Sequence, residues 1–211
     1  MGPHFSKRTP PKLAKSNQVP AGRVRIIGGN WKKSVLRFPA AEDLRPTPDR
    51  VRETLFNWLG QDLGGLECLD LFAGSGALGF EAASRGARRV VLVEREAHAV
   101  RALRANAERL AATNLEVLSG DSLAYLSRAT EQFDLVFLDP PFRQNVLPAV
   151  LGRLSQVLKS GSRVYVEAPV PVEAPVESQG RWRELKRSRA GQVSFQLLEW
   201  NDDRSGLPGD V

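Results

Sequence analysis

The stretch LDLFAGSGALG, residues 69–79, decides the fold class of this chain. It continues an apolar run of strand length, Cys68–Phe72, and leads into a helical pattern at Ala77–Ser84. Its three glycines have the GxGxxG spacing at the junction of strand and helix. Glycine permits a tight turn and lets a ligand approach the backbone beside a helix N-terminus. The stretch therefore predicts a strand–loop–helix unit that binds a ligand.

The same alternation of apolar runs and helical patterns continues downstream. We predict strands at Val90–Val93, Leu115–Leu118, Leu135–Leu138 and Arg163–Glu167, and helices at Ala97–Ala112, around Leu123–Ala129 and near Val146–Leu158. Such alternation with apolar strands is typical of a parallel sheet that is covered on both faces. Two final runs, Trp182–Ser188 and Val193–Trp200, flank Ala190-Gly191-Gln192 and predict a β-hairpin. The fold class is therefore α/β.

The chain upstream of this pattern is different in character. Residues 1–22 are rich in Pro, Lys and Ser and lack hydrophobic periodicity, so we predict a disordered arm. Two short strand-like runs, Arg23–Ile27 and Ser34–Phe38, flank Gly28-Gly29-Asn30. This pattern predicts a second β-hairpin.

A helix is expected between this hairpin and the glycine stretch. After a predicted loop at 39–46, Thr47 and Pro48 are typical of a helix start, with Thr47 as the N-cap and Pro48 in the first helical position. The apolar residues of Asp49–Leu59 then form a one-sided stripe. We therefore predict a helix over Asp49–Leu59.

The composition excludes several classes of protein. Hydrophobic residues make up 42% and charged residues 26% of the 211 residues, which is ordinary for a globular domain. No stretch approaches the roughly 18 apolar residues that span a membrane, and the start lacks an apolar signal-peptide core. A single cysteine, Cys68, and two histidines, His4 and His98, predict neither a disulfide nor a metal site. We expect a cytoplasmic protein with metal-free chemistry.

The positive charge is concentrated at the N-terminus. The formal net charge is +6, yet residues 1–41 contain nine Lys and Arg and no acid, so the rest of the chain is slightly acidic. A basic arm on an acidic body favours a polyanionic partner, because cations that neutralise phosphates release counterions. The alternative is a solvated tail that only aids solubility.

Carboxylates near the glycine stretch narrow the choice of ligand. Glu94 ends the next strand, twenty positions after Gly74, where a carboxylate can accept both ribose hydroxyls of a nicotinamide cofactor or of S-adenosylmethionine. Asp70 lies inside an apolar strand, which is costly without a partner; the ammonium of a methionine moiety supplies one, whereas a pyrophosphate is repelled. Asp121-Ser122 follows the third strand, and Asp121 is either an acceptor for an adenine amino group or an ordinary helix N-cap.

The tetrapeptide Asp139-Pro140-Pro141-Phe142 ends the fourth predicted strand of the parallel sheet. This strand is expected beside the first, so the tetrapeptide faces the ligand cleft. An exocyclic base amine is a poor nucleophile because its lone pair is delocalised into the ring. The Asp139 carboxylate and the Pro140 carbonyl can each accept one of its N–H bonds and aim the lone pair, while Phe142 stacks on the base. These features indicate methyl transfer to a nucleobase amine.

Several motifs resemble known families. Asp70–Gly79 and Asp139–Phe142 resemble the class I amino-methyltransferases, and LRPTPDRVRETLFN (Leu44–Asn57), RIIGG (Arg25–Gly29) and AGQV (Ala190–Val193) are similar to the bacterial 16S ribosomal RNA guanine-N2 methyltransferases that modify guanine 966. The resemblance runs from about Arg23 to Trp200, and Pro48 stands where a small hydroxyl residue is expected. It implies a seven-stranded, mostly parallel, Rossmann-like sheet with an antiparallel C-terminal strand, preceded by the short hairpin and helix.

We therefore expect four segments: a disordered basic arm (1–22), a hairpin that contacts RNA (23–42), the methyltransferase domain (43–200) and a flexible tail (201–211). The expected catalytic residues are Asp139, Pro140 and Phe142. The expected S-adenosylmethionine-binding residues are Thr47, Asp70, Phe72, Gly74, Gly76, Glu94, Asp121 and Ser122. The expected RNA-binding residues are Arg25, Lys32, Lys33, Arg45, Arg50, Pro141 and Arg143.

The expected function is methylation of guanine N2 in 16S ribosomal RNA, within an assembling small subunit, by a monomer. A DNA adenine-N6 methyltransferase is the main alternative, because both bases present an amine with two N–H donors; reading duplex DNA takes a recognition element for which the chain has little room. A nicotinamide-dependent oxidoreductase is disfavoured by Asp70, and an RNA-binding module without catalysis has no use for the Asp139 motif.

Overall fold

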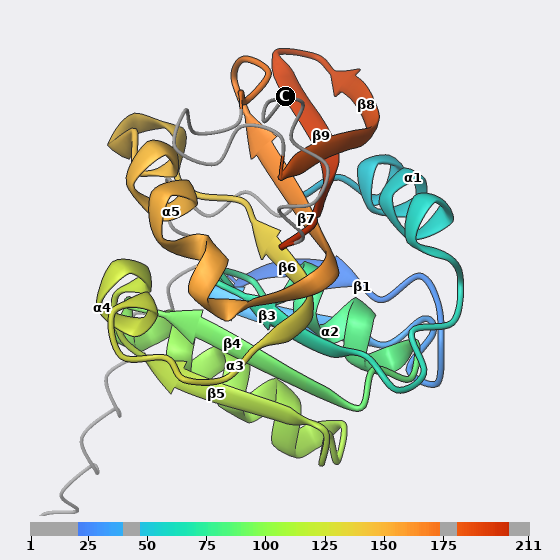
Figure 1. Cartoon of the computed structure of the whole chain (residues 1–211). Coiled ribbons are helices and arrows are strands. Elements are labelled where there is room, and N and C mark those ends of the chain that lie inside the picture. The colour runs from blue at the N-terminus through green and yellow to red at the C-terminus, as the bar shows by residue number, and fades with distance from the viewer. Residues whose placement is uncertain (1–20, 40–46, 174–180, 203–211) are drawn as a thin grey trace, which may run out of the picture.

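A computed structural model describes residues 21–39, 47–173 and 181–202 (Figure 1). The strands are β1 (Ala21–Arg25), β2 (Val35–Pro39), β3 (Glu67–Asp70), β4 (Arg89–Glu94), β5 (Leu115–Ser119), β6 (Phe133–Leu138), β7 (Leu158–Ala168), β8 (Trp182–Ala190) and β9 (Val193–Trp200). The helices are α1 (Asp49–Leu59), α2 (Ala77–Ser84), α3 (Ala97–Arg109), α4 (Ser122–Leu126) and α5 (Leu147–Leu154), with 3-10 turns at Phe142–Gln144 and Ser155–Val157.

The main sheet has seven strands in the order β5-β4-β3-β6-β7-β9-β8. The first five are parallel: Cys68 on β3 lies opposite Val90 on β4 and opposite Leu135 on β6. β9 runs antiparallel to β7, and β8 runs antiparallel to β9. The predicted fold class is therefore confirmed, including the neighbouring positions of β3 and β6.

Each face of the sheet is covered by its own set of elements (Figure 1). One buried cluster joins alternate strand residues such as Cys68 and Phe137 to α1, α2, α3 and the β1–β2 hairpin. The other joins the intervening residues, such as Leu69 and Val136, to α4 and α5. Because both faces are buried, the strands are apolar along their whole length, as the sequence pattern indicated.

The start of α1 differs from its sequence-based prediction. The helix begins at Asp49 as expected, but Pro48 is the N-cap residue and its carbonyl accepts from the amides of Val51 and Arg52. Pro48 has extended backbone angles (φ −56°, ψ 147°), which suit a cap. Thr47 is thus not the N-cap; its hydroxyl instead donates to Asp139 Oδ2 at 3.1 Å.

The boundary between α5 and β7 was also predicted wrongly. The helical pattern continues to Leu158, yet α5 ends at Leu154 and Leu158 is the first residue of β7. Leu158 pairs with Phe133 of β6 and is buried there. The sheet contact overrides the local periodicity, so β7 is longer than the predicted Arg163–Glu167.

The β1–β2 hairpin is confirmed, and it docks tightly on the end of α2. Asn30 N–H donates to the Ser84 carbonyl at 2.7 Å, and Trp31 N–H donates to Ser84 Oγ at 2.9 Å. Gly29 has φ +71°, and a Cβ built on it lies 1.9 Å from the Ser84 carbonyl oxygen. Only glycine therefore fits this contact.

A buried ion cluster ties the hairpin and α1 to α2. Glu81 is fully buried, and its Oε2 accepts from the Ile27 amide at 2.9 Å and from Arg52 Nη1 at 3.3 Å. Its Oε1 accepts from Arg85 Nε at 2.9 Å. Arg52 also donates to the carbonyl of Arg25 at 2.8 Å. The Glu81 carboxylate on α2 thus connects this helix to the β1–β2 hairpin and to α1.

Some sequence-based expectations lie outside the described residues. These are the disordered arm up to residue 20, the loop at 40–46 with Arg45, and the tail from residue 203. Within the described ranges, no helix is both long and apolar enough to cross a membrane.

Replacing Gly29 with Ala should destabilise the protein more than replacing Gly161 with Ala. Gly161 has φ +82° but open space around a built Cβ, so its variant pays only the left-handed backbone cost of about 1–2 kcal/mol. Gly29→Ala has the same backbone strain and must also displace Ser84, which costs roughly 2 kcal/mol more. Urea denaturation of both variants measures the difference. Equal losses would contradict the tight docking of the hairpin.

Candidate active site

The candidate site lies at the carboxyl ends of the central strands. From β3 the chain passes first to β4 on one side and later to β6 on the other, so β3 is the point where the strand order reverses. Ligands of open parallel sheets bind outside the strand ends at such a switch point. The glycine loop after β3 and the tetrapeptide after β6 both lie there.

The glycine loop has the backbone that its sequence predicts. Gly74 has φ +50°, and Gly76, the N-cap residue of α2, has φ +81°. At Gly79 a built Cβ lies 2.1 Å from Leu92 Cδ2, so this glycine lets α2 pack closely on β4. The loop thus presents backbone at the start of α2, where a ligand can approach it.

Glu94 supports this loop. One carboxylate oxygen accepts from the Gly74 amide at 2.8 Å, and the other accepts from the Glu96 amide at 2.8 Å. Each carboxylate oxygen has a second lone pair, so Glu94 can still accept from ribose hydroxyls. The side chain is half-buried at the end of β4. Its expected role in cofactor binding stays a prediction, and its structural role was not anticipated.

Asp70 is 2% exposed and has backbone partners that the sequence argument did not foresee. Its Oδ1 accepts from the Phe72 amide at 3.4 Å and its Oδ2 from the Gly79 amide at 3.2 Å. Burial raises the pKa of Asp70 to about 7; these two bonds oppose the rise, and the charge of Asp139 adds to it. The local fold therefore gives the buried carboxyl two partners that offset only part of the effect of burial, and contact with an ammonium group stays a prediction.

Asp121 is the N-cap of α4, as one of its two sequence-based interpretations held. Its Oδ1 accepts from the amides of Leu123 and Ala124 at 2.9 and 3.0 Å. Ser122 beside it is buried, and Phe72, at the start of the glycine loop, is half-buried. Contacts of these three residues with a cofactor stay predictions.

Asp139 and Thr47 meet at the end of β6. The Thr47 hydroxyl donates to Asp139 Oδ2 at 3.1 Å across 92 positions of sequence. Burial raises the pKa of Asp139 to about 6, while the Thr47 bond lowers it. Pro140 is buried, whereas Phe142 is 41% exposed. Asp139 and Pro140 therefore lie at the carboxyl end of β6, the neighbour of the strand that leads into the glycine loop, and the exposed Phe142 follows them in the chain. Thr47, which we expected at the cofactor, contacts the tetrapeptide.

A second buried carboxyl, Glu167, was missed by the sequence analysis. It lies near the end of β7, the neighbour of β6, is 4% exposed and accepts from the Tyr165 hydroxyl at 2.9 Å. Burial, followed by the charge of Asp139, raises the pKa of Glu167 to about 8. A carboxylate near the carboxyl end of a predicted strand was a signal that could have found it, because Asp139 was found in this way.

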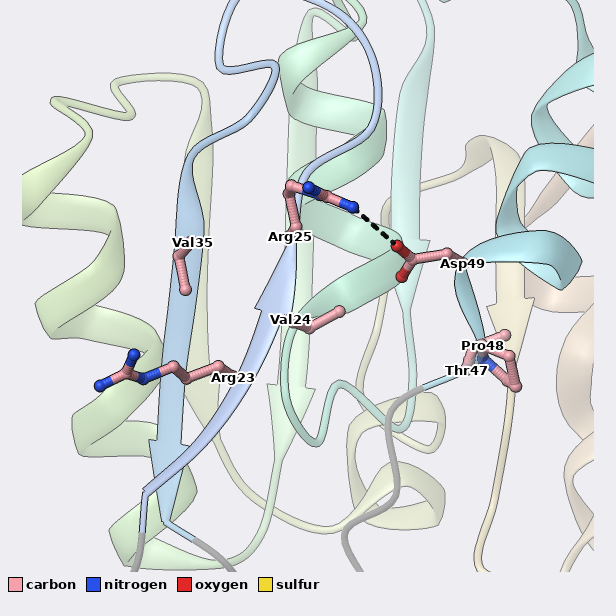
Figure 2. Close-up of a pocket in the computed structure, with 7 residues that line it drawn as sticks. All are labelled: Arg23, Val24, Arg25, Val35, Thr47, Pro48 and Asp49. Carbon is pink, nitrogen blue, oxygen red and sulfur yellow. Dashed lines mark ion pairs between the residues drawn. The ribbon is translucent and has the colours of Figure 1, made fainter.

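Apart from Arg45, which lies outside the described residues, the residues predicted to bind RNA are exposed but divided between three places. Arg25 lies beside the start of α1, where it pairs with Asp49 at 3.8 Å (Figure 2). Lys32 and Lys33 lie in the hairpin turn, which docks at the far end of α2 from the glycine loop. Arg50, Pro141 and Arg143 are exposed near the strand ends. The structure therefore does not bring the lysines to the cleft.

A hollow of about 350 Å³ opens between the hairpin and α1. Its lining residues are Arg23, Val24, Arg25, Val35, Thr47, Pro48 and Asp49 (Figure 2). Through Thr47 this hollow borders Asp139. Arg23, another residue that the sequence analysis did not select, lies directly opposite Arg37 in the hairpin, and both are exposed. The period-two pattern of the strands was the signal that could have placed both on one face.

Comparison with known proteins agrees with this geometry. Residues 24–199 match the family model described as conserved hypothetical protein 95. The chain is similar to the solved structure of a putative methyltransferase, yhhF, from Escherichia coli, with 38% identity and a TM-score of 0.77, over 86% of this chain and 100% of that one.

Two curated relatives carry the same name, ribosomal RNA small subunit methyltransferase D. The protein from Escherichia coli (strain K12) is 38% identical over 89% of this chain and 95% of its own length. The protein from Haemophilus influenzae is 41% identical over 84% of this chain and 94% of its own length. The chain therefore belongs to the family of ribosomal RNA small subunit methyltransferase D.

Proposed function

We propose that this protein is a monomeric cytoplasmic enzyme that transfers a methyl group from S-adenosylmethionine to the exocyclic N2 of a guanine in 16S ribosomal RNA. We further propose that the substrate is a small-subunit particle. The observation that carries the proposal is the Asp139–Pro140 acceptor pair beside the glycine loop, with Thr47 bound to Asp139. The names of the relatives support ribosomal RNA as the substrate.

The chemistry of the donor set fits the cofactor. Glu94 lies at the end of β4 and has free lone pairs for two ribose hydroxyls. The glycine loop exposes its backbone to a ligand, and no residue larger than glycine fits at Gly76. Asp70, Asp139 and Glu94 add negative potential that suits a sulfonium cation and an ammonium group. S-adenosylmethionine supplies the activated methyl group; Asp121 and Ser122 are assigned to its adenine end.

Asp139 and Pro140 perform the orienting step in this proposal. Asp139 Oδ2 accepts from Thr47, so we assign Oδ1 to one N–H of the guanine amine and the Pro140 carbonyl to the other. These two bonds turn the nitrogen towards a tetrahedral shape and aim its lone pair at the methyl carbon. Positioning of this kind provides most of the catalysis in such a transfer. The methylated ammonium is acidic and loses its proton readily, and Asp139 can accept it.

The outer surface supports recognition of a phosphate backbone. Arg23 and Arg37 face one another across the β1–β2 ladder, and like charges at this position repel unless an anion lies between them. A nucleotide that leaves its stack can place its base on Phe142, which is 41% exposed. The hairpin and α1 provide too small a surface for reading a DNA groove, so an exposed RNA loop is the better fit.

Nucleoside analysis tests the function directly. Ribosomal particles from a strain that lacks the enzyme should acquire N2-methylguanine when they are incubated with the protein and S-adenosylmethionine. Asp139→Ala should abolish this product while it leaves cofactor affinity within a few-fold, because Asp139 orients the amine. Mass spectrometry of the digested RNA and calorimetry measure the two effects. Methyladenine, or methylated DNA with unmodified RNA, would favour the DNA methyltransferase instead.

Glu94→Ala should act on cofactor binding. Loss of charge-assisted bonds to ribose hydroxyls should cost about 1.5–3 kcal/mol, which is roughly a tenfold to hundredfold weaker Kd. Because Glu94 also holds the Gly74 amide, Glu94→Gln serves as a companion that keeps one acceptor oxygen. Calorimetry gives the Kd of each variant, and the rate at saturating cofactor should change little. An unchanged Kd would limit Glu94 to its bonds with the loop.

Neutralising the outer face of the hairpin should flatten the salt dependence of RNA binding. Arg23→Gln with Arg37→Gln should reduce the slope of log K against log salt by roughly 0.7–0.9 for each lost phosphate contact. Lys32→Gln with Lys33→Gln tests the docked turn separately, and exposed Lys186→Gln on the edge strand β8 is the control. If the first pair leaves the slope unchanged, the hairpin face does not bind RNA.

A further inference from the structure

Glu167 and Asp139 lie on neighbouring strands at the same end of the sheet. Leu138 of β6 is paired with Val166 of β7, so the residues that follow them, Asp139 and Glu167, are neighbours across the ladder. Glu167 is 4% exposed. A buried carboxylate without a cation is costly, whereas a carboxylic acid with hydrogen-bond partners is not.

The polar neighbours of Glu167 are two hydroxyl groups, those of Tyr165 and Thr47, and a protonated carboxyl can form a hydrogen bond with each of them. Tyr165, fully buried on the same strand, donates its hydroxyl to Glu167 Oε1 at 2.9 Å. The Thr47 hydroxyl donates to Asp139 Oδ2 at 3.1 Å. It also lies close to the Glu167 carboxyl, and a bond that it donates there, like the bond from Tyr165, lowers the pKa of Glu167 against the larger effect of burial. A threonine hydroxyl has one proton. While that proton points at Asp139, only a protonated Glu167 can complete a hydrogen bond with Thr47 Oγ1.

The charges around Glu167 and Asp139 also favour the protonated form of Glu167. The charge of Asp139, at the end of β6, raises the pKa of Glu167 and also that of Asp70 at the end of β3. Tyr165 is enclosed by the aromatic rings of Phe137 and Phe195, which come from β6 and β9. Burial raises the pKa of Glu167 from 4.5 to about 8 and that of Asp139 only to about 6. At neutral pH one proton is therefore held on Glu167.

We propose that Glu167 is a positioning residue that stays protonated during the reaction and directs the Thr47 hydroxyl towards Asp139. The hydrogen bonds then run in one direction, from Tyr165 to Glu167, to Thr47 and to the ionised Asp139. This leaves Asp139 ionised and held by Thr47, with an oxygen for the substrate amine. The inference rests on the proposed role of Asp139 in methyl transfer.

This role differs from that of a proton acceptor, and the variant Glu167→Gln separates the two. The glutamine amide can donate to Thr47 and its carbonyl can accept from Tyr165, as a protonated glutamate does. If Glu167 only positions Thr47, the substitution Glu167→Gln should therefore cost little activity. If Glu167 must accept the proton of the product, the same substitution should abolish activity.

The decisive measurement is the pH dependence of kcat at saturating substrates. In the wild type, kcat should fall above about pH 8, to roughly one tenth of its plateau at one pH unit higher, because ionised Glu167 competes for the Thr47 proton. Glu167→Gln should keep kcat within about twofold of the wild-type plateau at pH 7 and should lose this alkaline fall. The acid limb, which Asp139 sets, should stay where it is, since Glu167 is already neutral there.

Controls make each outcome informative. Glu116→Gln, an exposed substitution on β5, should leave the alkaline fall in place; both variants act on the same RNA, so ionisation of the base affects them equally. An inactive but folded Glu167→Gln that still binds S-adenosylmethionine would overturn the proposal in favour of a proton acceptor. An alkaline fall that persists in this variant would assign the ionisation to another group.

A second readout needs no RNA. A carboxyl whose pKa is raised by folding loses its contribution to stability as the pH rises from the unfolded value, 4.5, to the folded value, about 8. The denaturation midpoint of Glu167→Gln should therefore gain on that of the wild type across this window and level off above it. A constant difference overturns the protonated state of Glu167. Absence of N2-methylguanine from the wild-type reaction, by contrast, defeats only the proposed function.

Discussion

The buried carboxylate of Glu81 is the constraint on which the arrangement of the site depends. It accepts hydrogen bonds from the Ile27 amide and from two arginines, Arg52 on α1 and Arg85 directly after α2. Each of these three buried charges costs several kcal/mol to desolvate, and removal of one leaves another without its full set of partners, so such a cluster holds its elements in one arrangement. The hairpin and α1 are thereby fixed on the sheet, although neither contributes a strand to it.

This anchoring brings Thr47, from the segment before α1, to the end of β6. Arg52, held by Glu81, also donates through Nε to the Thr47 carbonyl at 3.3 Å. That bond holds the segment before α1 against the end of β6, where the Thr47 hydroxyl meets Asp139. The segment upstream of the glycine stretch is thus part of the site itself, and the same segment presents Arg23 and Arg25 on the outside.

The resulting distribution of charge is sharply divided. Acidic groups, namely Asp70, Glu94, Asp139 and Glu167, gather at the carboxyl ends of the strands, and arginines occupy the outward face of the hairpin. Negative potential in a cleft suits a cationic methyl donor, whereas a cationic rim suits a phosphate backbone. Burial raises the pKa of Asp70 to about 7 and that of Glu167 to about 8, and the charge of Asp139 adds to both shifts.

The sequence by itself determined the fold class, the order of the elements, the glycine loop and the Asp139 tetrapeptide. These features are local: a strand, a turn and a helix start are written in adjacent residues, and apolar strands identify a sheet that is buried on both faces. Tertiary structure alone decided that the Thr47 hydroxyl donates to Asp139 instead of capping α1, and that Leu158 belongs to a strand. It also decided that Glu167 lies beside Asp139 and that Lys32 and Lys33 lie away from the cleft. Each of these depends on contacts between residues far apart in the chain, which no local pattern records, because the partner that satisfies a buried polar group is chosen by packing.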